Sequence, residues 1–242
     1  MALNISYSSI SSYLICPARY YYSKQPIQVA RSASLIYGAA FHELLAKSLS
    51  GQPVTAKQVL APYLTGKPKE GEGNWNGRIV YSDKDWRPDV MEIWMQDAVS
   101  LVLSLPTKPQ AVEMKLSRTI GDITLTGVID ALWGGKLVDF KFTASRFFKA
   151  DLLQAACYAL LNGGPSTFQF LVFHRDKTPR LEPITVKETQ DQQYLDWTVN
   201  WVIRPTVKAI EAGNFPANRG HNLCSQEYCS YWDICRKTGE IR

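Results

Sequence analysis

Two aspartates and a lysine, Asp130, Asp139 and Lys141, lie on either side of a Gly-Gly pair. The apolar, β-branched runs that flank Gly134 and Gly135 predict a β-hairpin with a two-residue turn. Counting outward from this turn places Asp130 opposite Asp139 on one face, with Lys141 two residues further along that face. Facing carboxylates repel each other, so the pattern predicts a protonated carboxyl group or a divalent cation between them.

The opposite face of the second strand of this hairpin is apolar, because it carries Val138, Phe140 and Phe142. We therefore expect that face to be buried. A simpler alternative remains for the aspartates, since both side chains could reach solvent if the hairpin lay at the edge of a sheet.

A second group of candidate ligands lies near the C-terminus, where Cys224, Cys229 and Cys235 are spaced C-x4-C-x5-C. In a reduced compartment, three clustered cysteines indicate a metal site more often than a disulfide. A tetrahedral thiolate site needs a fourth ligand, and Cys16 is a better candidate than Cys157, which falls in the middle of an expected helix. The spacing alone does not distinguish between a zinc site, an iron–sulfur cluster and a group of cysteines that binds no metal.

Composition is that of a globular protein, with 242 residues, 45% hydrophobic and 20% charged, which excludes a disordered chain. The net charge of +5 is compatible with a polyanionic partner. No apolar run approaches the roughly 18 residues that a membrane helix needs. The N-terminal residues lack a secretory signal pattern, so we expect a cytoplasmic protein without a membrane partner.

Periodicity and capping patterns place these residues on expected elements. We expect helices over residues 8–24 with a break at Pro17, 34–49 with a cap at Ser34, 56–64, 87–104, 151–161, and 188–212 with an interruption near Pro205. Expected strands cover residues 111–118, 122–132, 136–142, 167–174 and 180–186. Residues 67–78 read as a long loop, either a flap that faces nucleic acid or a solvated connector.

Three further side chains become candidates for a functional site only when the residues near them are considered. His42 falls within the expected helix 34–49, where a lone histidine is usually structural unless a nearby metal needs a ligand. Gln154 and Tyr158 are four residues apart and therefore share one helix face.

Six motifs in this order resemble the PD-(D/E)XK nuclease superfamily, and in particular its RecB-like iron–sulfur branch. That branch includes CRISPR-associated spacer-acquisition nucleases and AddB-type helicase–nucleases. The motifs are an S-x-x-S…CP element ending at Cys16-Pro17, G-x-x-x-H ending at His42, G-x-x-D ending at Asp130, D-x-K at Asp139–Lys141, Q-x-x-x-Y at Gln154–Tyr158, and the C-terminal cysteines.

The resemblance implies a role for each matching residue. His42, Asp130, Asp139 and the Phe140 carbonyl would bind Mg²⁺ or Mn²⁺, and Lys141 would orient or activate the attacking water. Gln154 and Tyr158 would contact DNA or support the site, with Glu113 as a further supporting residue on the first strand of the β region.

By the same resemblance, a [4Fe-4S] cluster would be held by Cys16, Cys224, Cys229 and Cys235. Relatives usually have C-x2-C-x5-C, so this chain has two extra residues between Cys224 and Cys229, and zinc stays an alternative.

The resulting expectation is a single α/β nuclease domain over residues 1–242 with a restriction-endonuclease-like core, a mixed central sheet flanked by helices. Residues 1–30 and 214–242 would form one metal-cluster subregion that staples the ends together. The expected activity is metal-dependent hydrolysis of DNA, by an exonuclease that acts on single strands or duplex ends in CRISPR spacer acquisition, recombination or repair, together with proteins of those pathways. The alternatives are a non-catalytic nucleic-acid-binding module of nuclease ancestry and a zinc-stabilised protein whose carboxylate pair is incidental.

Overall fold

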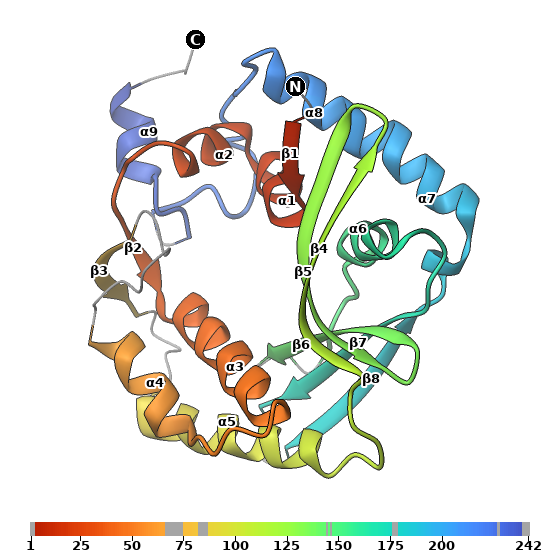
Figure 1. The fold of residues 1–242 in the computed structure, drawn as a ribbon. Helices are drawn as coiled ribbons and strands as arrows, with labels where there is room; N and C mark the ends of the chain where they lie inside the picture. The colour runs from red at the N-terminus through yellow and green to blue at the C-terminus, as the bar shows by residue number, and fades with distance from the viewer. Residues whose placement is uncertain are drawn as a thin grey trace.

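The structure is a computed structural model that describes residues 3–65, 75–81, 87–143, 145, 147–175, 179–226 and 228–238. A six-stranded mixed sheet runs through the molecule, with helices on both of its faces (Figure 1). Its strands are β1 (Leu3–Ser6), β4 (Ala111–Ile120), β5 (Ile123–Trp133), β6 (Lys136–Thr143), β7 (Phe168–His174) and β8 (Arg180–Val186). The observed architecture is therefore the mixed α/β sheet expected from the sequence.

Strand β6 lies inside the sheet, because the strand order is β1-β5-β6-β7-β8 and β6 pairs in parallel with β7. The β5–β6 hairpin has the predicted register, with Trp133 opposite Lys136 across the turn. Gly134 and Gly135 have φ angles of 58° and 73°, which a primed turn requires and which glycine adopts without strain. The alternative in which the hairpin lies at an edge is wrong.

The longest strand, β5, changes partner along one of its edges. Residues 123–126 pair with β1 in parallel, and residues 131–133 pair with β6 in antiparallel fashion. Strand β4 runs along the other edge from Ile120 to Ala111. On the edge of β5 that pairs with β1 and β6, residues 127–130 consequently have no partner strand among the residues that the structure describes. This leaves room there for side chains.

Helices cover the two faces of the sheet as separate groups (Figure 1). On one face pack α3 (Ala33–Leu49), α4 (Ala56–Leu64) and α5 (Pro88–Leu103), which share a core with Ala131, Val138 and Phe140. The other face is covered by α6 (Leu152–Asn162), α7 (Gln192–Thr198) and α8 (Arg204–Glu211). The predicted burial of Val138 and Phe140 is confirmed, with 1% and 2% of each residue exposed.

Element boundaries differ from the sequence expectations at a few points. Helix α3 begins at Ala33, one residue before the expected start, and the side chain of Ser32 rather than that of Ser34 caps it by accepting from the Leu35 amide. Of the expected loop 67–78, residues 67–74 lie outside the described residues, and Trp75–Val80 form strand β3, which pairs with β2 (Val29–Ser32).

The interruption expected near Pro205 exists and takes the form of a π-helical turn over Val199–Ile203, after a short 3₁₀ turn at Glu188–Gln190. Proline lacks an amide hydrogen and its ring clashes with the preceding turn, so a regular α-helix cannot continue through this point.

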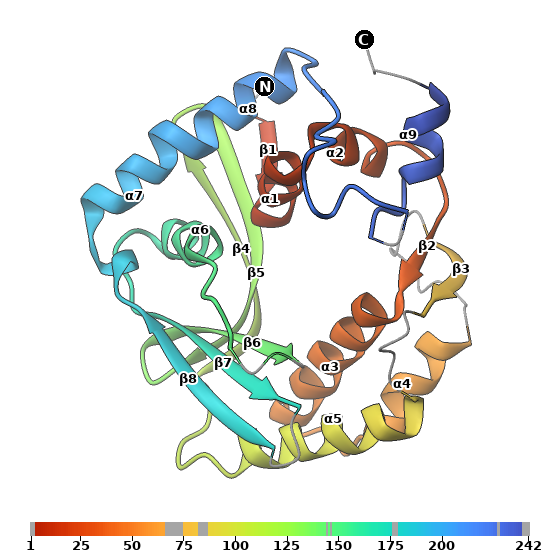
Figure 2. The same ribbon diagram turned by 180° about the vertical axis from the view of Figure 1, so that it is seen from behind.

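The two ends of the chain meet beside the sheet, where α1 (Tyr7–Ile15), α2 (Pro17–Ser23) and α9 (Trp232–Thr238) lie together (Figure 2). The predicted break at Pro17 separates α1 from α2. Among the described residues, hydrogen bonds that join this region to the C-terminal segment include Tyr13 Oη to the Asn214 carbonyl (2.6 Å), the Ala18 amide to the Pro216 carbonyl (3.3 Å), Asn218 Nδ2 to the Ile15 carbonyl (3.0 Å) and the Asn218 amide to Cys16 Sγ (3.4 Å). Among the described residues, no helix is both long enough and apolar enough to span a membrane.

Candidate active site and cysteine pocket

The candidate active site lies at the unpaired stretch of β5, where the hairpin ladder stops after Ala131 and Val138. Asp130 would be the next residue to pair with β6, but its Oδ2 instead accepts a hydrogen bond from the Phe140 amide at 2.8 Å. The same oxygen lies 3.2 Å from His42 Nδ1 on α3. The structure therefore brings together His42 and the hairpin, which are far apart in the sequence.

Glu113 lies opposite Asp130, between the pairs Val112–Ala131 and Met114–Ile129 of the β4–β5 ladder. Its φ angle is 52°, and among the described residues no other residue except glycine has a positive φ. The side-chain alternation of β5 is interrupted at the same point, because Ile129 packs toward α6 whereas Ala131 packs toward α3. A left-handed conformation costs roughly 1–2 kcal/mol for a residue with a Cβ atom. This strain at the carboxylates makes the position a functional candidate.

Asp139 is only 3% exposed and stands in a three-membered polar network. Gln154 Nε2 donates to Asp139 Oδ1 at 2.6 Å, and Lys141 Nζ donates to Gln154 Oε1 at 3.0 Å. Lys141 Nζ also lies 2.8 Å from Asp139 Oδ2, but this buried oxygen has no hydrogen-bond partner in good alignment. The expected cluster of Asp139, Lys141 and Gln154 is therefore present as a closed ring of contacts.

The electrostatics of the cluster follow from burial and from the carboxylates. Burial raises the pKa of Asp139 to about 6, and repulsion from Asp130 adds to the shift, against the attraction of Lys141 and His42. Burial acts to lower the pKa of His42, but the charge and hydrogen bond of Asp130 outweigh it, so the pKa of His42 is raised. Burial, followed by the charge of Asp130, raises the pKa of Glu113. These five groups therefore influence one another's charge and form one electrostatic unit.

Helix α6 carries Gln154 to this cluster, and its position depends on its N-terminus. Asp151 caps the helix by accepting from the Gln154 amide at 2.9 Å, and Tyr7 Oη on α1 donates to the other oxygen of Asp151. Gly127 lets the helix approach β5 closely, because a Cβ there would lie 2.8 Å from Leu161 Cδ1. Tyr158 packs in the same place, and burial followed by the charge of Asp139 raises its pKa.

Sequence reasoning missed the clamp between Tyr7 and Asp151. An acidic cap followed three residues later by Gln154 is a capping signal that could have singled out Asp151. No local pattern could have predicted Tyr7, whose partner lies 144 residues away.

His174 is a second residue that sequence reasoning missed. It is 1% exposed, and its Nε2 lies 2.7 Å from Glu182 Oε2, while Nδ1 lies 2.8 Å from the Ser145 carbonyl in the segment after β6. His174 thus connects the segment between Lys141 and α6 to the far strands of the sheet.

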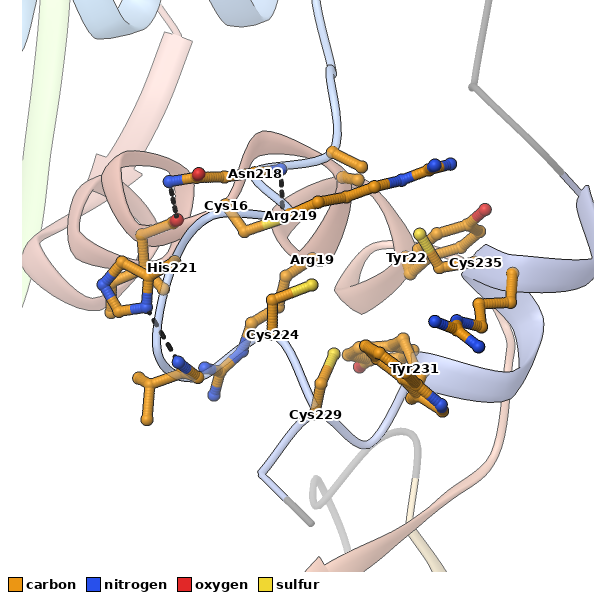
Figure 3. Close-up of a pocket in the computed structure, with 16 residues that line it drawn as sticks. Cys16, Arg19, Tyr22, Asn218, Arg219, His221, Cys224, Cys229, Tyr231 and Cys235 are labelled. Carbon is orange, nitrogen blue, oxygen red and sulfur yellow. Dashed lines mark hydrogen bonds between the residues drawn. The ribbon is translucent and has the colours of Figure 1, made fainter. Parts of the chain in front are cut away.

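The cysteine pocket, a cavity of about 340 Å³ between α1, α2 and the C-terminal segment, is lined by Cys16, Cys224, Cys229 and Cys235 (Figure 3). All four are free thiols, and the Asn218 amide donates to Cys16 Sγ at 3.4 Å. Burial, with contributions from Cys16 and Cys224, raises the pKa of both Cys229 and Cys235. The fifth cysteine, Cys157, is fully buried in α6 and its pKa is raised to about 12, as expected for an inert thiol.

No three His, Cys, Asp or Glu side chains within the described ranges are placed so that they could hold one metal ion. In the candidate active site, His42 instead contacts Asp130, and Lys141 contacts Asp139. The donor set of two carboxylates and one imidazole nevertheless suits Mg²⁺ or Mn²⁺ chemically. Asp139 Oδ2, buried without a well-aligned donor, is a further observation that fits a cation at this place.

Comparison with solved structures shows the same overall fold in another protein. A protein from Eubacterium rectale, described as a proposed exonuclease, superposes with a TM-score of 0.58 at 12% identity, over 99% of this chain and 89% of that one. SSO0001 gives a TM-score of 0.47 at 13% identity, over 97% of this chain and 86% of that one. No curated protein sequence matches the chain.

The sequence itself matches a family model over nearly its whole described length. The match runs from residue 4 to residue 236 and therefore includes the hairpin, α3, α6 and the C-terminal cysteines. The chain belongs to the PD-(D/E)XK nuclease superfamily.

Proposed function

We propose that the protein is a divalent-metal-dependent nuclease that hydrolyses phosphodiester bonds in DNA. The observation that carries this proposal is the meeting of His42, Asp130, Asp139 and Lys141 at the unpaired stretch of β5. Buried carboxylates that repel each other beside a lysine are costly for folding alone, so their retention needs a chemical reason.

Each residue has a separate role in this proposal. His42, Asp130 and Asp139, with the Phe140 carbonyl, would hold Mg²⁺ or Mn²⁺, which when bound polarises a phosphoryl oxygen and acidifies water. Lys141 Nζ, fixed by Gln154 Oε1 at 3.0 Å and by Asp139, orients the attacking water and stabilises charge on the phosphate.

The supporting residues hold this arrangement in place. Gln154 keeps Asp139 and Lys141 in register through one hydrogen bond to each. Tyr158 braces α6 against the sheet, and Glu113 supports Asp130 from the facing strand.

We further propose that the four cysteines of the cysteine pocket hold a [4Fe-4S] cluster. One zinc ion would need all four sulfur atoms about 2.3 Å from a single point. A four-iron cluster holds each thiolate on a different iron atom, so its ligands stand further apart around a larger space, which suits a pocket of about 340 Å³. The amide that donates to Cys16 Sγ is a feature that tunes such clusters.

We therefore propose that the protein is one nuclease domain over residues 1–242 and a member of the RecB-like iron–sulfur branch, which includes CRISPR-associated spacer-acquisition nucleases and AddB-type nucleases. Residues 1–30 and 214–242 act as one subregion that staples the two ends of the chain. Exonuclease action on single strands or duplex ends is the preferred activity, and the description of the Eubacterium rectale protein agrees with it. Spacer acquisition, recombination and repair are the candidate pathways.

The nuclease proposal is tested by a time course on 5′- and 3′-labelled single- and double-stranded DNA with Mn²⁺, Mg²⁺ or EDTA. We expect metal-dependent cleavage by the wild type, none by Asp139→Ala, and wild-type cleavage by the matched control Asp122→Ala, since Asp122 is exposed at the β4–β5 turn. Folding of each variant is checked by circular dichroism. An Asp139→Ala protein as active as wild type would refute the assignment. No cleavage by folded wild type would favour the alternative, a non-catalytic nucleic-acid-binding module.

The cluster proposal is tested by iron and zinc analysis and visible absorbance of protein purified without oxygen. We expect a broad iron–sulfur band that Cys224→Ser abolishes and that the control Cys157→Ala keeps. Stoichiometric zinc with no visible band would overturn the iron–sulfur proposal.

A further inference from the structure

A wide groove lies next to the cysteine pocket and outside the candidate active site. It has a volume of about 970 Å³ and runs between α1 and α2 on one side and β2 and the start of α3 on the other. It shares Arg19 and Tyr231 with the cysteine pocket. None of the groups assigned above to metal or to catalysis lines it.

The charge of this groove is one-sided. Arg19, Lys24 and Arg31 line it, and none of the described residues that line it is an aspartate or a glutamate. Serine side chains make up much of the remaining polar lining, among them Ser8 and Ser12 of α1. Arginine and lysine combined with serine hydroxyl groups is the donor set that binds the phosphates of nucleic acids.

Apolar side chains lie in the same groove beside the cations. Leu35 is 58% exposed at the start of α3, and Pro26 and Val29 also line the groove. In a duplex the faces of the bases are stacked and hidden, whereas in a single strand they are free to contact apolar or aromatic side chains. The combination therefore favours a single strand over a duplex.

The groove also points toward the candidate active site. Its α3 wall, at Leu35, stands seven residues before His42 on the same helix, a distance of about 10 Å at 1.5 Å per residue. Its α1 wall, at Ser8, follows Tyr7, whose hydroxyl group holds the Asp151 cap of the helix that carries Gln154. The two walls of the groove thus continue into both sides of the candidate site.

We propose that this groove binds the backbone of single-stranded DNA and leads the strand to the candidate active site; this rests on the proposed nuclease function. Arg19, Lys24 and Arg31 neutralise phosphates, while Leu35 and its apolar neighbours contact the bases without reading their sequence. Substrate selection for single strands then comes from the groove, and hydrolysis comes from the site at the end of it.

The test measures DNA binding separately from hydrolysis. A fluorescein-labelled oligo(dT) of about 15 nucleotides is titrated in EDTA with wild type and with the double variant Lys24→Ala/Arg31→Ala, using anisotropy at several salt concentrations. We expect the variant to bind at least about tenfold more weakly, and its salt slope to fall by about 1.4, at 0.7 for each lost phosphate contact. The matched control is Lys57→Ala/Lys208→Ala, which removes two exposed lysines outside the groove and should bind like wild type.

Hydrolysis of a small diester, the p-nitrophenyl ester of thymidine 5′-phosphate, is measured with Mn²⁺ on the same proteins. The groove variant should hydrolyse it at the wild-type rate, because this substrate does not reach the groove, which also shows that the variant is folded. Unchanged oligo(dT) affinity and salt slope in the groove variant would overturn the proposal that this groove binds single-stranded DNA. Absence of diester hydrolysis by wild type would count against the nuclease proposal alone, since binding in EDTA is judged independently.

Discussion

Replacing Asp139 with asparagine should stabilise the metal-free protein near neutral pH. Burial raises the pKa of Asp139 from 3.8 to about 6, and each pKa unit corresponds to about 1.4 kcal/mol. The ionised carboxylate thus lowers the free energy of unfolding by about 3 kcal/mol above pH 6. The sign follows from linkage: between pH 4 and 6 the folded protein binds more protons than the unfolded chain, so this group's contribution to stability falls as the pH rises.

The expected gain is smaller than 3 kcal/mol because asparagine disturbs the polar network. Lys141 only donates hydrogen bonds, so every orientation of two amides at positions 139 and 154 leaves one donor facing another. Such a conflict costs about 1–2 kcal/mol. The net gain for Asp139→Asn at pH 7.5 in EDTA is then about 1–2 kcal/mol, which raises Tm by about 2–8 °C in a chain of this size.

Thermal and urea denaturation of wild type, Asp139→Asn and the exposed control Asp122→Asn, each in EDTA at pH 7.5 and pH 4, provide the measurement. The advantage of the variant should shrink by about 2 kcal/mol at pH 4, where the folded wild type is largely protonated at Asp139. Excess Mn²⁺ at pH 7.5 should favour the wild type instead, because a bound ion stabilises only a protein that can hold it. A variant that is less stable than wild type in EDTA, by the same amount at both pH values, would show that attraction to Lys141 outweighs burial.

Three further substitutions test how the site is positioned. Glu113→Gly should raise the free energy of unfolding by about 1 kcal/mol by relieving the positive φ, whereas Glu113→Gln keeps that strain and should show no comparable gain in urea unfolding. Tyr7→Phe should lower the free energy of unfolding by about 1.5–3 kcal/mol, because the carboxylate of Asp151 loses its charge-assisted hydrogen bond. A loss below about 0.5 kcal/mol, measured in the same way, would contradict a stabilising role for the Tyr7–Asp151 hydrogen bond. Gly127→Val should lower Tm and the rate of DNA cleavage together, since the side chain would push Leu161 and α6 away from β5; unchanged values of both would show that the close approach is dispensable.

The sequence was sufficient to predict the hairpin because its determinants are local. Two glycines fix the turn, the turn fixes the register from Trp133–Lys136 to Ala131–Val138, and Asp130 and Asp139 follow directly where this ladder stops. The helix that carries Gln154 and Tyr158 was likewise predicted within one residue at each end. Both cases rest on periodicity and capping within about a dozen residues.

The features that escaped prediction depend on contacts distant in the sequence. Strand β1 is four residues long and exists because β5 lies beside it, more than 100 residues away. The gap between β1 and β6 along β5 leaves Asp130 without a described strand partner on that edge. This gap depends on the positions of three strands together, so the sequence of any single strand does not indicate it. The burial of Asp139 could not be predicted either, because an aspartate in a strand is normally exposed and only the neighbouring β7 and α6 cover it.

Helix α1 joins parts of the molecule that leave the ribosome at very different times. The hairpin and α6 are made well before residues 214–218, whose contacts with Tyr13, Ile15 and Ala18 seat the first two helices. Contacts across some 200 residues form slowly, since a long loop must close first. During synthesis the active-site carboxylates are therefore present before α1 reaches its final position. The hydrogen bond from Tyr7 to Asp151 on α6 then forms late. The order of assembly then delays completion of the candidate active site until residues 214–218 have been made.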